Sequence, residues 1–251
     1  MKKILFVGDL HCGSRTGLNP FPDNETQKAL WAKWLDMIKW AGKVDACVCN
    51  GDAIDGKGKN DPTQTEPDRL NQAKLAVECL KKLKTPNFYL TYGTPFHVTS
   101  KDGEDYEGLI SDLLRQKGFK ATIEEYYNNI ECDGVRFRVR HKIGGSSIPH
   151  GRATAPNKER VWNMLNSYLE EEEQADVLVY SHVHYFQYCG DEISEAITLP
   201  CWQAKGSKYG ARQCSGRITN GAVLYECNKG GFIRREFLFK IRDKYSGKVR
   251  V

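Results

Sequence analysis

The chain has 251 residues, of which 40% are hydrophobic and 11% aromatic, and its formal net charge is +5. This length suits one sizeable α/β domain, and the composition supports a packed core rather than a disordered chain. A mean hydropathy of -0.58 argues against a membrane protein. The apolar run that follows Lys2 and Lys3 covers only residues 4–7, too few for a signal peptide, so we expect a cytoplasmic protein.

Charge and cysteine content narrow the class further. Residues 201–251 carry 12 Lys and Arg against 3 Asp and Glu, a net charge of +9, whereas the first 200 residues carry −4. This basic C-terminal segment is either a solvated tail or a region that attracts a polyanion such as nucleic acid. The nine cysteines are odd in number and lack C-x-x-C spacing, so we expect reduced, mostly buried thiols.

Short β-branched runs alternate with amphipathic segments over the first 200 residues, which predicts an α/β layered domain. In chain order we predict a strand at 3–7, a helix at 24–40, strands at 46–49 and 87–91 around a helix at 68–83, and a helix at 107–116. A hairpin follows at 126–130 and 135–140, then a helix at 157–171, a strand at 176–180 and a hairpin of strands 222–226 and 232–239. Asn24 and Gln27 have capping-box spacing at the first helix. The mixture of helix-linked and hairpin-linked strands predicts two sheets. We expect a single domain, 1–251, because no repeat or linker interrupts the chain.

Five of the six histidines lie in short clusters that also contain aspartates. The clusters are G-D-L-H-C-G at 8–13, N-G-D-A-I-D at 50–55, G-T-P-F-H at 93–97, and His141 followed by S-H-V-H at 181–184. Imidazole nitrogen and carboxylate oxygen suit zinc, manganese and iron. The first three clusters and 181–184 each follow a predicted buried strand. Because the carboxyl ends of strands converge on the ligand crevice of a layered α/β fold, the clusters predict a metal site.

Spacing within the clusters suggests how the side chains bind. Asp9 and His11 lie two apart in a segment that we expect to be extended, so both project from one side and can hold one ion; His182 and His184 have the same spacing. Asp52 follows Gly51 in a tight turn and is the natural carboxylate to bridge two cations. Asp55 is more suited to hydrogen bonding that supports a ligand than to ligation.

These blocks resemble the calcineurin-like metallophosphoesterase superfamily, whose signature runs D-x-H, G-D-x-x-D, G-N-H-(D/E), a lone His, then G-H-x-H. Four of the five blocks match, over residues 9–184. The resemblance implies an α/β fold, a four-layer α/β/β/α sandwich of two mixed sheets flanked by helices. It also implies two divalent or trivalent metal ions (Mn, Fe or Zn). Asp9, His11 and His184 would hold the first ion, His141 and His182 the second, and Asp52 would bridge them, with in-line attack by a bridging hydroxide on phosphorus.

The third block departs from the signature, because Gly93-Thr94-Pro95-Phe96-His97 stands where Gly-Asn-His is expected. One reading gives the second-metal position to the Thr94 hydroxyl and makes His97 the general acid. The other places His97 on the metal. This variant resembles phage-type members of the superfamily. In the last block, Ser181 and Val183 depart only outside the ligands.

We therefore expect a dinuclear metal-dependent phosphoesterase, with Asp52 and His97 as catalytic residues. A nucleic-acid or nucleotide phosphodiester is the favoured substrate, and a phosphoprotein is the alternative. The rival hypothesis is a non-catalytic module of the same fold that binds nucleic acid or protein, and the altered third block favours it. No membrane partner is expected, and the oligomeric state stays open.

Overall fold

The computed structural model describes residues 1–56, 63–98, 104–124, 128–169, 172–205 and 218–241. The strands are β1 Lys2–Val7, β2 Ala46–Asn50, β3 Asn87–Thr91, β4 Lys120–Glu124, β5 Asn128–Cys132, β6 Val135–Arg140, β7 Val177–Tyr180, β8 Gln187–Gly190, β9 Glu195–Thr198, β10 Asn220–Asn228 and β11 Gly231–Phe239. The helices are α1 Glu25–Ala41, α2 Arg69–Leu80, α3 Pro95–Val98, α4 Tyr106–Gln116, the 3₁₀ turn η1 His150–Ala153, and α5 Thr154–Tyr168. None of the helices in the described part of the chain is long and apolar enough to cross a membrane.

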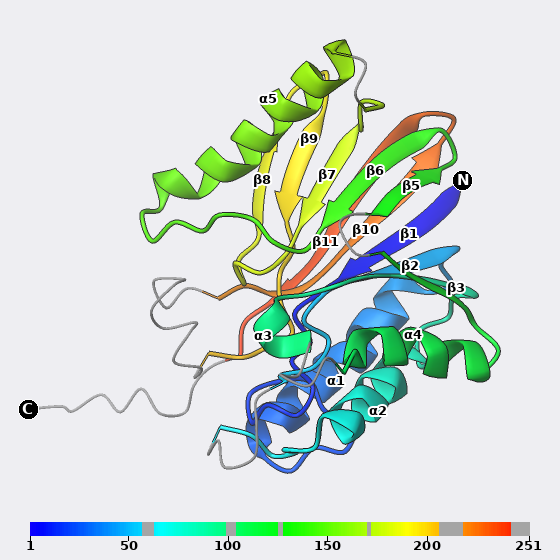
Figure 1. The fold of residues 1–251 in the computed structure, drawn as a ribbon, viewed down its shortest axis with the longest axis vertical. Helices are drawn as coiled ribbons and strands as arrows, with labels where there is room; N and C mark the ends of the chain where they lie inside the picture. The colour runs from blue at the N-terminus through cyan, green and yellow to red at the C-terminus, as the bar shows by residue number, and fades with distance from the viewer. Residues whose placement is uncertain (57–62, 99–103, 125–127, 170–171, 206–217, 242–251) are drawn as a thin grey trace, which may run out of the picture.

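The strands form two mixed sheets (Figure 1). The first has the order β11-β10-β1-β2-β3-β4, in which β1 to β4 are parallel and the C-terminal hairpin β10–β11 is antiparallel. The second has the order β5-β6-β7-β9-β8, with β6, β7 and β9 parallel. Helices α1, α2 and α4 cover the outer face of the first sheet, and α5 covers the second (Figure 1). The predicted four-layer α/β/β/α sandwich is confirmed.

Three apolar clusters hold these layers together. The helices of the first layer pack on the sheet through a large cluster that includes Trp34 and Trp202, whose rings meet edge to face at 4.7 Å. Between the sheets, Phe6 from β1, Phe137 from β6 and Tyr225 from β10 form an aromatic triangle with ring centroids 5.1 to 5.6 Å apart. Because these side chains come from both sheets, they fix how the two strand layers meet.

Local sequence signals explain the ends of several elements. Asn24 caps α1 by accepting a hydrogen bond from the Gln27 amide at 3.0 Å. The Gln27 side chain accepts instead from the amide of Asp23, one residue before the cap, so the reciprocal half of the capping box is displaced by one position. Both hairpins turn through two residues of positive φ, Asp133-Gly134 and Lys229-Gly230, as two-residue type I′ turns require.

The structure adds elements that the sequence pattern did not reveal: β4, β8, β9 and the short helix α3. Helix α5 begins at Thr154, three residues before the predicted start, because Pro156 is tolerated in its first turn. The predicted end of this helix at residue 171 and the start of a hairpin strand at 126 lie outside the described residues.

Candidate metal centre

The candidate ligands all follow the carboxyl ends of parallel strands from both sheets. Asp9 and His11 follow β1, Asp52 follows β2, Thr94 and His97 follow β3, His141 follows β6, and His182 and His184 follow β7. These strand ends meet at one edge of the sandwich, where α3 lies (Figure 1). Five of the side chains are nearly inaccessible, with residue exposures of 3% or less: Asp9, His11, Asp52, His141 and His184. Thr94, His97 and His182 are half-buried.

The predicted residues converge in three overlapping groups. These are Asp9, His11 and His184; then Asp52, His141 and His182; and, joining them, His11, Asp52 and His97. Within each group the candidate ligand atoms all lie within 4.8 Å of one another. Since His11 and His184 are separated by 173 positions, only the tertiary fold brings them together.

The first group has the spacing of a coordination sphere. His11 Nε2 lies 3.2 Å from His184 Nε2, which lies 3.5 Å from Asp9 Oδ1. Ligands about 2.1 Å from one ion lie roughly 3.0 to 3.4 Å from each other. Asp9 Oδ1 is buried and accepts no hydrogen bond among the described residues, although its partner oxygen Oδ2 accepts one from the His182 amide at 3.1 Å. A buried carboxylate oxygen in this condition fits a cation.

The second group gathers around Asp52. His141 Nε2 lies 3.1 Å from Asp52 Oδ2. The Thr94 hydroxyl lies between the members of the group, 3.1 Å from Asp52 Oδ2, 3.4 Å from His141 Nε2 and 3.3 Å from His182 Nδ1. The Thr94 amide also donates to Asp52 Oδ1 at 2.7 Å. The Thr94 hydroxyl therefore lies within 3.4 Å of a polar atom of each member of the second group.

His97 belongs to the joining group rather than to the second. Its ring packs edge-on against that of His11, with the centroids 4.8 Å apart. Its Nδ1 donates to the main-chain oxygen of Asp55 at 2.6 Å, because a carbonyl can only accept. His141 is held in the same way, by donation from Nδ1 to the Asn50 carbonyl at 2.8 Å. When either ring is neutral, this bond leaves the lone pair on Nε2, the arrangement that supporting hydrogen bonds impose on metal-binding histidines.

Asp55 supports the site by hydrogen bonding, as the sequence suggested. Its Oδ1 lies 3.2 Å from His11 Nδ1, and its Oδ2 accepts from Gln64 Nε2 at 3.2 Å. His150 is an exposed loop residue at the start of η1, and Cys12 is a buried residue that packs in the core.

The backbone at the site is strained. Seven non-glycine residues in the described segments have positive φ, and Asp133 and Lys229 are accounted for by the hairpin turns. The other five are Asp9 (50°), His11 (46°), Asp52 (50°), His182 (72°) and His184 (56°). The expectation that Asp9 and His11 lie in an extended segment is therefore wrong. Each stands alone in the left-handed region, which non-glycine residues adopt at a cost when function requires it.

Two glycines allow the segments to approach so closely. A Cβ at Gly51, whose φ is +73°, would lie 2.3 Å from His141 Nδ1. A Cβ at Gly93 would lie 2.2 Å from Asp52 Oδ1 and 2.3 Å from its amide nitrogen. A side chain at either position would push a candidate ligand out of place.

The charges within the site are strongly coupled. Burial would raise the pKa of Asp52, but the charge and hydrogen bond of His141, together with the charges of His97 and His11, hold it well below its usual range. Burial would likewise lower the pKa of His141, yet Asp52 raises it to about 9. The pKa of His182 falls to about 4, chiefly through burial and then through repulsion from His141. The charged form of these buried carboxylates is therefore stabilised by positive charge close by.

Glu107 was not predicted from the sequence, where it reads as an ordinary helix residue. It lies in the first turn of α4, is 1% exposed, and accepts hydrogen bonds from the amides of Ala53 at 2.8 Å and Gly93 at 2.6 Å. Those amides flank Asp52 and Thr94 in sequence. One buried carboxylate therefore ties together two of the loops that carry the site.

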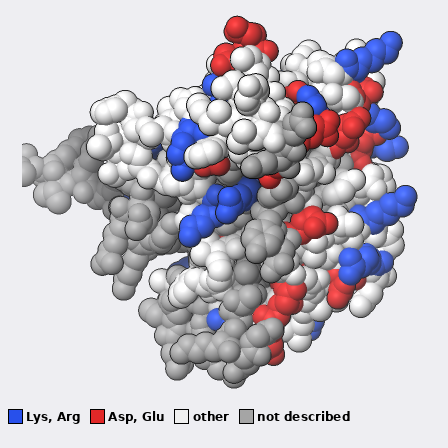
Figure 2. Space-filling model, turned by 45° about the horizontal axis from the view of Figure 1, so that its top comes forward, with Lys and Arg blue, Asp and Glu red and all other residues white. Residues whose placement is uncertain are grey.

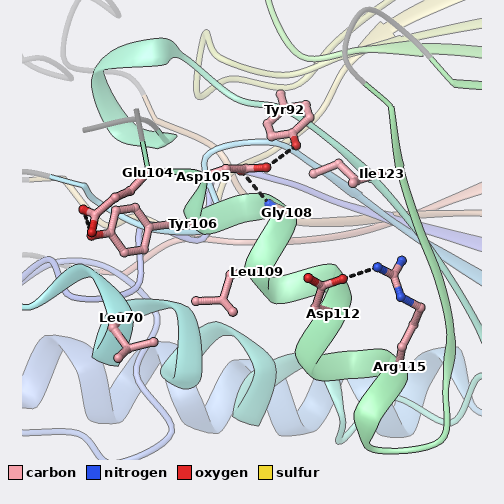
Figure 3. A pocket seen from close by; sticks show the side chains of 10 residues that line it. All are labelled: Leu70, Tyr92, Glu104, Asp105, Tyr106, Gly108, Leu109, Asp112, Arg115 and Ile123. Atoms are coloured by element: carbon pink, nitrogen blue, oxygen red, sulfur yellow. Dashed lines mark hydrogen bonds and ion pairs between the residues drawn. The ribbon is translucent and has the colours of Figure 1, made fainter. Parts of the chain in front are cut away.

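A hollow of about 600 Å³ lies between α2 and α4 (Figure 3). Its polar groups are already paired: the Tyr92 hydroxyl and the Gly108 amide donate to Asp105, and Arg115 pairs with Asp112. None of the candidate metal ligands lines it. The candidate site is therefore the side-chain cluster at the strand ends and not this hollow.

Comparison with protein families and with curated proteins found no match. Among solved structures, the chain is similar to a single mutant of Vps29 from Entamoeba histolytica (14% identity, 95% of this chain and 99% of that chain covered, TM-score 0.45). It is also similar to an archaeal phosphodiesterase (13%, 94% and 99%, 0.47) and to a predicted phosphoesterase from Streptococcus pneumoniae (12%, 94% and 98%, 0.38). Likenesses this distant carry no information about activity, so function is inferred from the site's own residues.

Proposed function

We propose that the protein is a dinuclear metal-dependent phosphoesterase. The observation that carries this proposal is the convergence of two ligand groups, one around Asp9 and one around His141, with Asp52 and His11 shared by the group that joins them. Two-metal sites of this kind clamp both the attacking and the leaving oxygen of a phosphate ester. A single-ion site would not require the second set of imidazoles.

In this proposal Asp9, His11 and His184 hold the first ion, His141, His182 and Thr94 hold the second, and Asp52 bridges them. When bound, the ions supply an activated water near neutral pH and neutralise charge on the phosphate oxygens. The protein contributes buried, pre-oriented ligands: the His182 amide fixes Asp9, the Thr94 amide fixes Asp52, and main-chain carbonyls fix His141 and His97. We propose manganese, iron or zinc for this donor set.

His97 is assigned to the reacting group of the substrate rather than to the second ion. Thr94 already fills the position among Asp52, His141 and His182, while His97 lies on the other side, against His11. With Nδ1 committed to the Asp55 carbonyl, Nε2 is the atom that would exchange a proton with the leaving oxygen. Replacement of His97 by Ala should lower turnover while both ions are retained, and loss of one ion would instead make His97 a ligand.

A nucleic-acid or nucleotide phosphodiester is the proposed substrate, with a phosphoprotein as the alternative. Two arginines in the described part of the basic C-terminal segment are neutralised by acids and attract a polyanion less: Arg234 pairs with Glu195 and Glu236, and Arg235 pairs with Glu226. Basic and acidic side chains are also interspersed over the face shown in Figure 2. The remaining basic residues of this segment that would bear on the question fall mainly at 206–217 and 242–251, outside the described residues.

The test is hydrolysis of bis(p-nitrophenyl) phosphate, p-nitrophenyl phosphate, cyclic nucleotides and DNA ends by chelator-treated protein to which manganese is restored. We expect metal-dependent turnover, and a fall of at least about 1,000-fold for Asp52→Asn with loss of bound metal. Asp191→Asn is the matched control, because Asp191 is an exposed acid in the β8–β9 connection that pairs with Arg160 and accepts from the amides of Ile193 and Ser194. Turnover that survives chelation, or Asp52→Asn with full activity, would reject the proposal.

The second candidate is a non-catalytic module of the same fold, favoured by the absence of the Asn-His pair from the third block. It predicts metal binding without hydrolysis of any of these esters. The position of Thr94 argues against it, since the missing ligand has a geometric substitute.

A further inference from the structure

Two buried residues that follow β9, Cys201 and Trp202, contact the main chain of the ligands proposed for the first ion. The Trp202 amide donates to the Asp9 carbonyl at 3.0 Å. The Cys201 amide donates to the Thr219 carbonyl at 2.9 Å, and the Thr219 amide donates to the His184 carbonyl at 3.0 Å. Asp9 and His184 have φ of 50° and 56°, a backbone conformation that persists where surrounding contacts impose it. The segment after β9 supplies such contacts for both ligands.

The side chain of Cys201 also reaches the ring of His184. Nε2 of this ring lies 3.2 Å from His11 Nε2 and 3.5 Å from Asp9 Oδ1, so it faces the place of the first ion. Nδ1 is the ring nitrogen nearer the main chain, and the Cys201 sulfur lies 3.9 Å from the His184 carbonyl oxygen, on that side. Burial would lower the pKa of His184, but the charge and hydrogen bonding of Cys201, together with those of Asp9, raise it well above its ordinary value.

The hydrogen bonds around Cys201 leave its sulfur able to accept from this ring. The thiol has one proton, and the Gln203 carbonyl at 3.2 Å is a closer acceptor than the His184 carbonyl at 3.9 Å. The proton therefore lies toward Gln203, and the sulfur lone pairs are left to donors nearby. Asn220 Nδ2 is one such donor, at 3.7 Å. Nδ1–H of His184 is the other, and a neutral ring that donates from Nδ1 keeps its lone pair on Nε2.

Two further histidines that direct Nε2 into the site have a buried acceptor at the same place. His11 Nδ1 lies 3.2 Å from Asp55 Oδ1, and His141 Nδ1 donates to the Asn50 carbonyl at 2.8 Å. For His184 the corresponding group is a sulfur instead of an oxygen. Acceptors of this kind fix the ring orientation and the tautomer of metal-binding histidines.

We propose that Cys201 is a positioning residue for the first metal ion, whose sulfur accepts from Nδ1 of His184 and directs Nε2 toward that ion. The inference rests on the proposed function, because it concerns an ion that the dinuclear site would hold. Among the described residues, Cys201 belongs to none of the groups whose ligand atoms converge within 4.8 Å. It therefore acts through His184 and does not bind the ion itself.

The test is calorimetric titration of the chelator-treated full chain with Mn²⁺. We expect the wild-type protein to bind two ions. Cys201→Ala removes the acceptor and should weaken one of the two binding steps by about 10- to 100-fold, while the other step is unchanged. Cys201→Ser retains a group that both donates and accepts, so it should restore most of the lost affinity.

Cys47→Ala is the matched control. Cys47 lies on β2, is as fully buried as Cys201, and has a thiol pKa that is raised by burial alone. Its replacement also removes a sulfur from the core but changes no contact with a candidate ligand. Both Mn²⁺ binding steps should therefore keep their wild-type affinity.

A spectroscopic readout separates ring orientation from packing. In the Zn²⁺-loaded wild-type protein, the Nδ1–H proton of His184 should give an imidazole NMR signal, which His184→Gln would remove and so assign. Because a proton loses deshielding when its hydrogen bond is lost, this signal should move upfield in Cys201→Ala. It should return toward its original position in Cys201→Ser and stay unchanged in Cys47→Ala.

The outcomes distinguish this inference from the proposed function. If the wild-type chain binds two ions and Cys201→Ala binds them equally well, the positioning role is wrong and the dinuclear site stands. The same conclusion follows if Cys47→Ala weakens binding as much as Cys201→Ala, or if Cys201→Ser restores nothing. A wild-type chain that binds no metal would overturn the proposed function, and this inference with it.

Discussion

Removal of the Glu107 carboxylate should loosen the metal centre without touching any candidate ligand. Glu107 accepts from the amides of Ala53 and Gly93, at 2.8 and 2.6 Å, in a site from which water is excluded. In Glu107→Ala both donors lose their partner. Each buried donor left unsatisfied costs about 1 to 3 kcal/mol, so the free energy of unfolding should fall by roughly 2 to 6 kcal/mol.

Glu107→Gln should have about half that effect. Its amide oxygen can accept from one of the two donors, but its NH₂ group faces the other and offers it nothing. We expect a loss of about 1 to 3 kcal/mol. The comparison of Ala with Gln therefore separates the loss of one hydrogen bond from the loss of two.

Metal affinity should also fall, because Ala53 follows the proposed bridging residue Asp52 and Gly93 precedes Thr94. Residues that orient metal ligands typically contribute about 10- to 100-fold to affinity. The assays are urea unfolding of the metal-free protein and calorimetric titration with Mn²⁺. Asp112→Asn, on the exposed side of the same helix, is the control and should change stability by less than about 0.5 kcal/mol.

Two results would refute this reasoning in different ways. If Glu107→Ala unfolds with the wild-type free energy, the two hydrogen bonds contribute nothing and the bracing role is wrong. If stability falls but Mn²⁺ binds with unchanged affinity and stoichiometry, Glu107 stabilises the fold without positioning the ligands.

Three further predictions concern the candidate metal site, Glu107 and the core beneath α1. Gly93→Ala should reduce Mn²⁺ affinity, measured calorimetrically, because its Cβ would meet Asp52 Oδ1 at 2.2 Å; unchanged binding would contradict the close approach. Burial, reinforced by the charge of Asp52, raises the pKa of Glu107 from 4.5 to about 8, against its two amide hydrogen bonds. The folded metal-free chain therefore keeps a proton that the unfolded chain releases, and its stability should fall as pH rises through this window, by up to about 1.4 kcal/mol per pH unit. Glu107→Gln should remove that slope from urea unfolding midpoints, and an identical slope in the variant would assign it to another group. Trp34→Ala should cost about 3 to 5 kcal/mol in the same assay, because Trp34 is fully buried and donates to the Cys79 carbonyl at 3.2 Å; a loss below 1 kcal/mol would show that the core refills the cavity.

Much of the fold could be predicted from local sequence wherever an apolar run or a turn motif is unambiguous. The apolar runs that became β1, β2, β3 and β7 are buried on both faces and need no partner to be recognised. The hairpin of β5 and β6 could be predicted from its turn, because Asp133-Gly134 is a local signal for a two-residue connection. Strands β8 and β9 were missed because their sequences, QYCG and EAIT, contain polar residues or glycine and form no continuous apolar run like the VLVY of β7.

The third block, residues 93–97, shows a limit of prediction from residue pattern. The sequence shows that the asparagine of the signature is absent. It leaves open whether Thr94 or His97 takes the second-metal position of that asparagine. The proposed assignment depends on tertiary contacts: the Thr94 hydroxyl lies within 3.4 Å of Asp52, His141 and His182, and the ring of His97 lies against that of His11. Glu107 carried no signal at all, since its role consists entirely of contacts with loops that begin in other strands.

By itself, the sequence determined which side chains a metal centre could draw on, because it places imidazoles and carboxylates directly after buried strands. Only the tertiary structure decided which of them meet and which are braced from behind. The physical reason is the separation in sequence of the residues that specify each feature. Strands, caps and turns are specified by residues within a few positions of each other. Asp9 and His184 become neighbours only when two sheets stack and their strand ends meet at one edge.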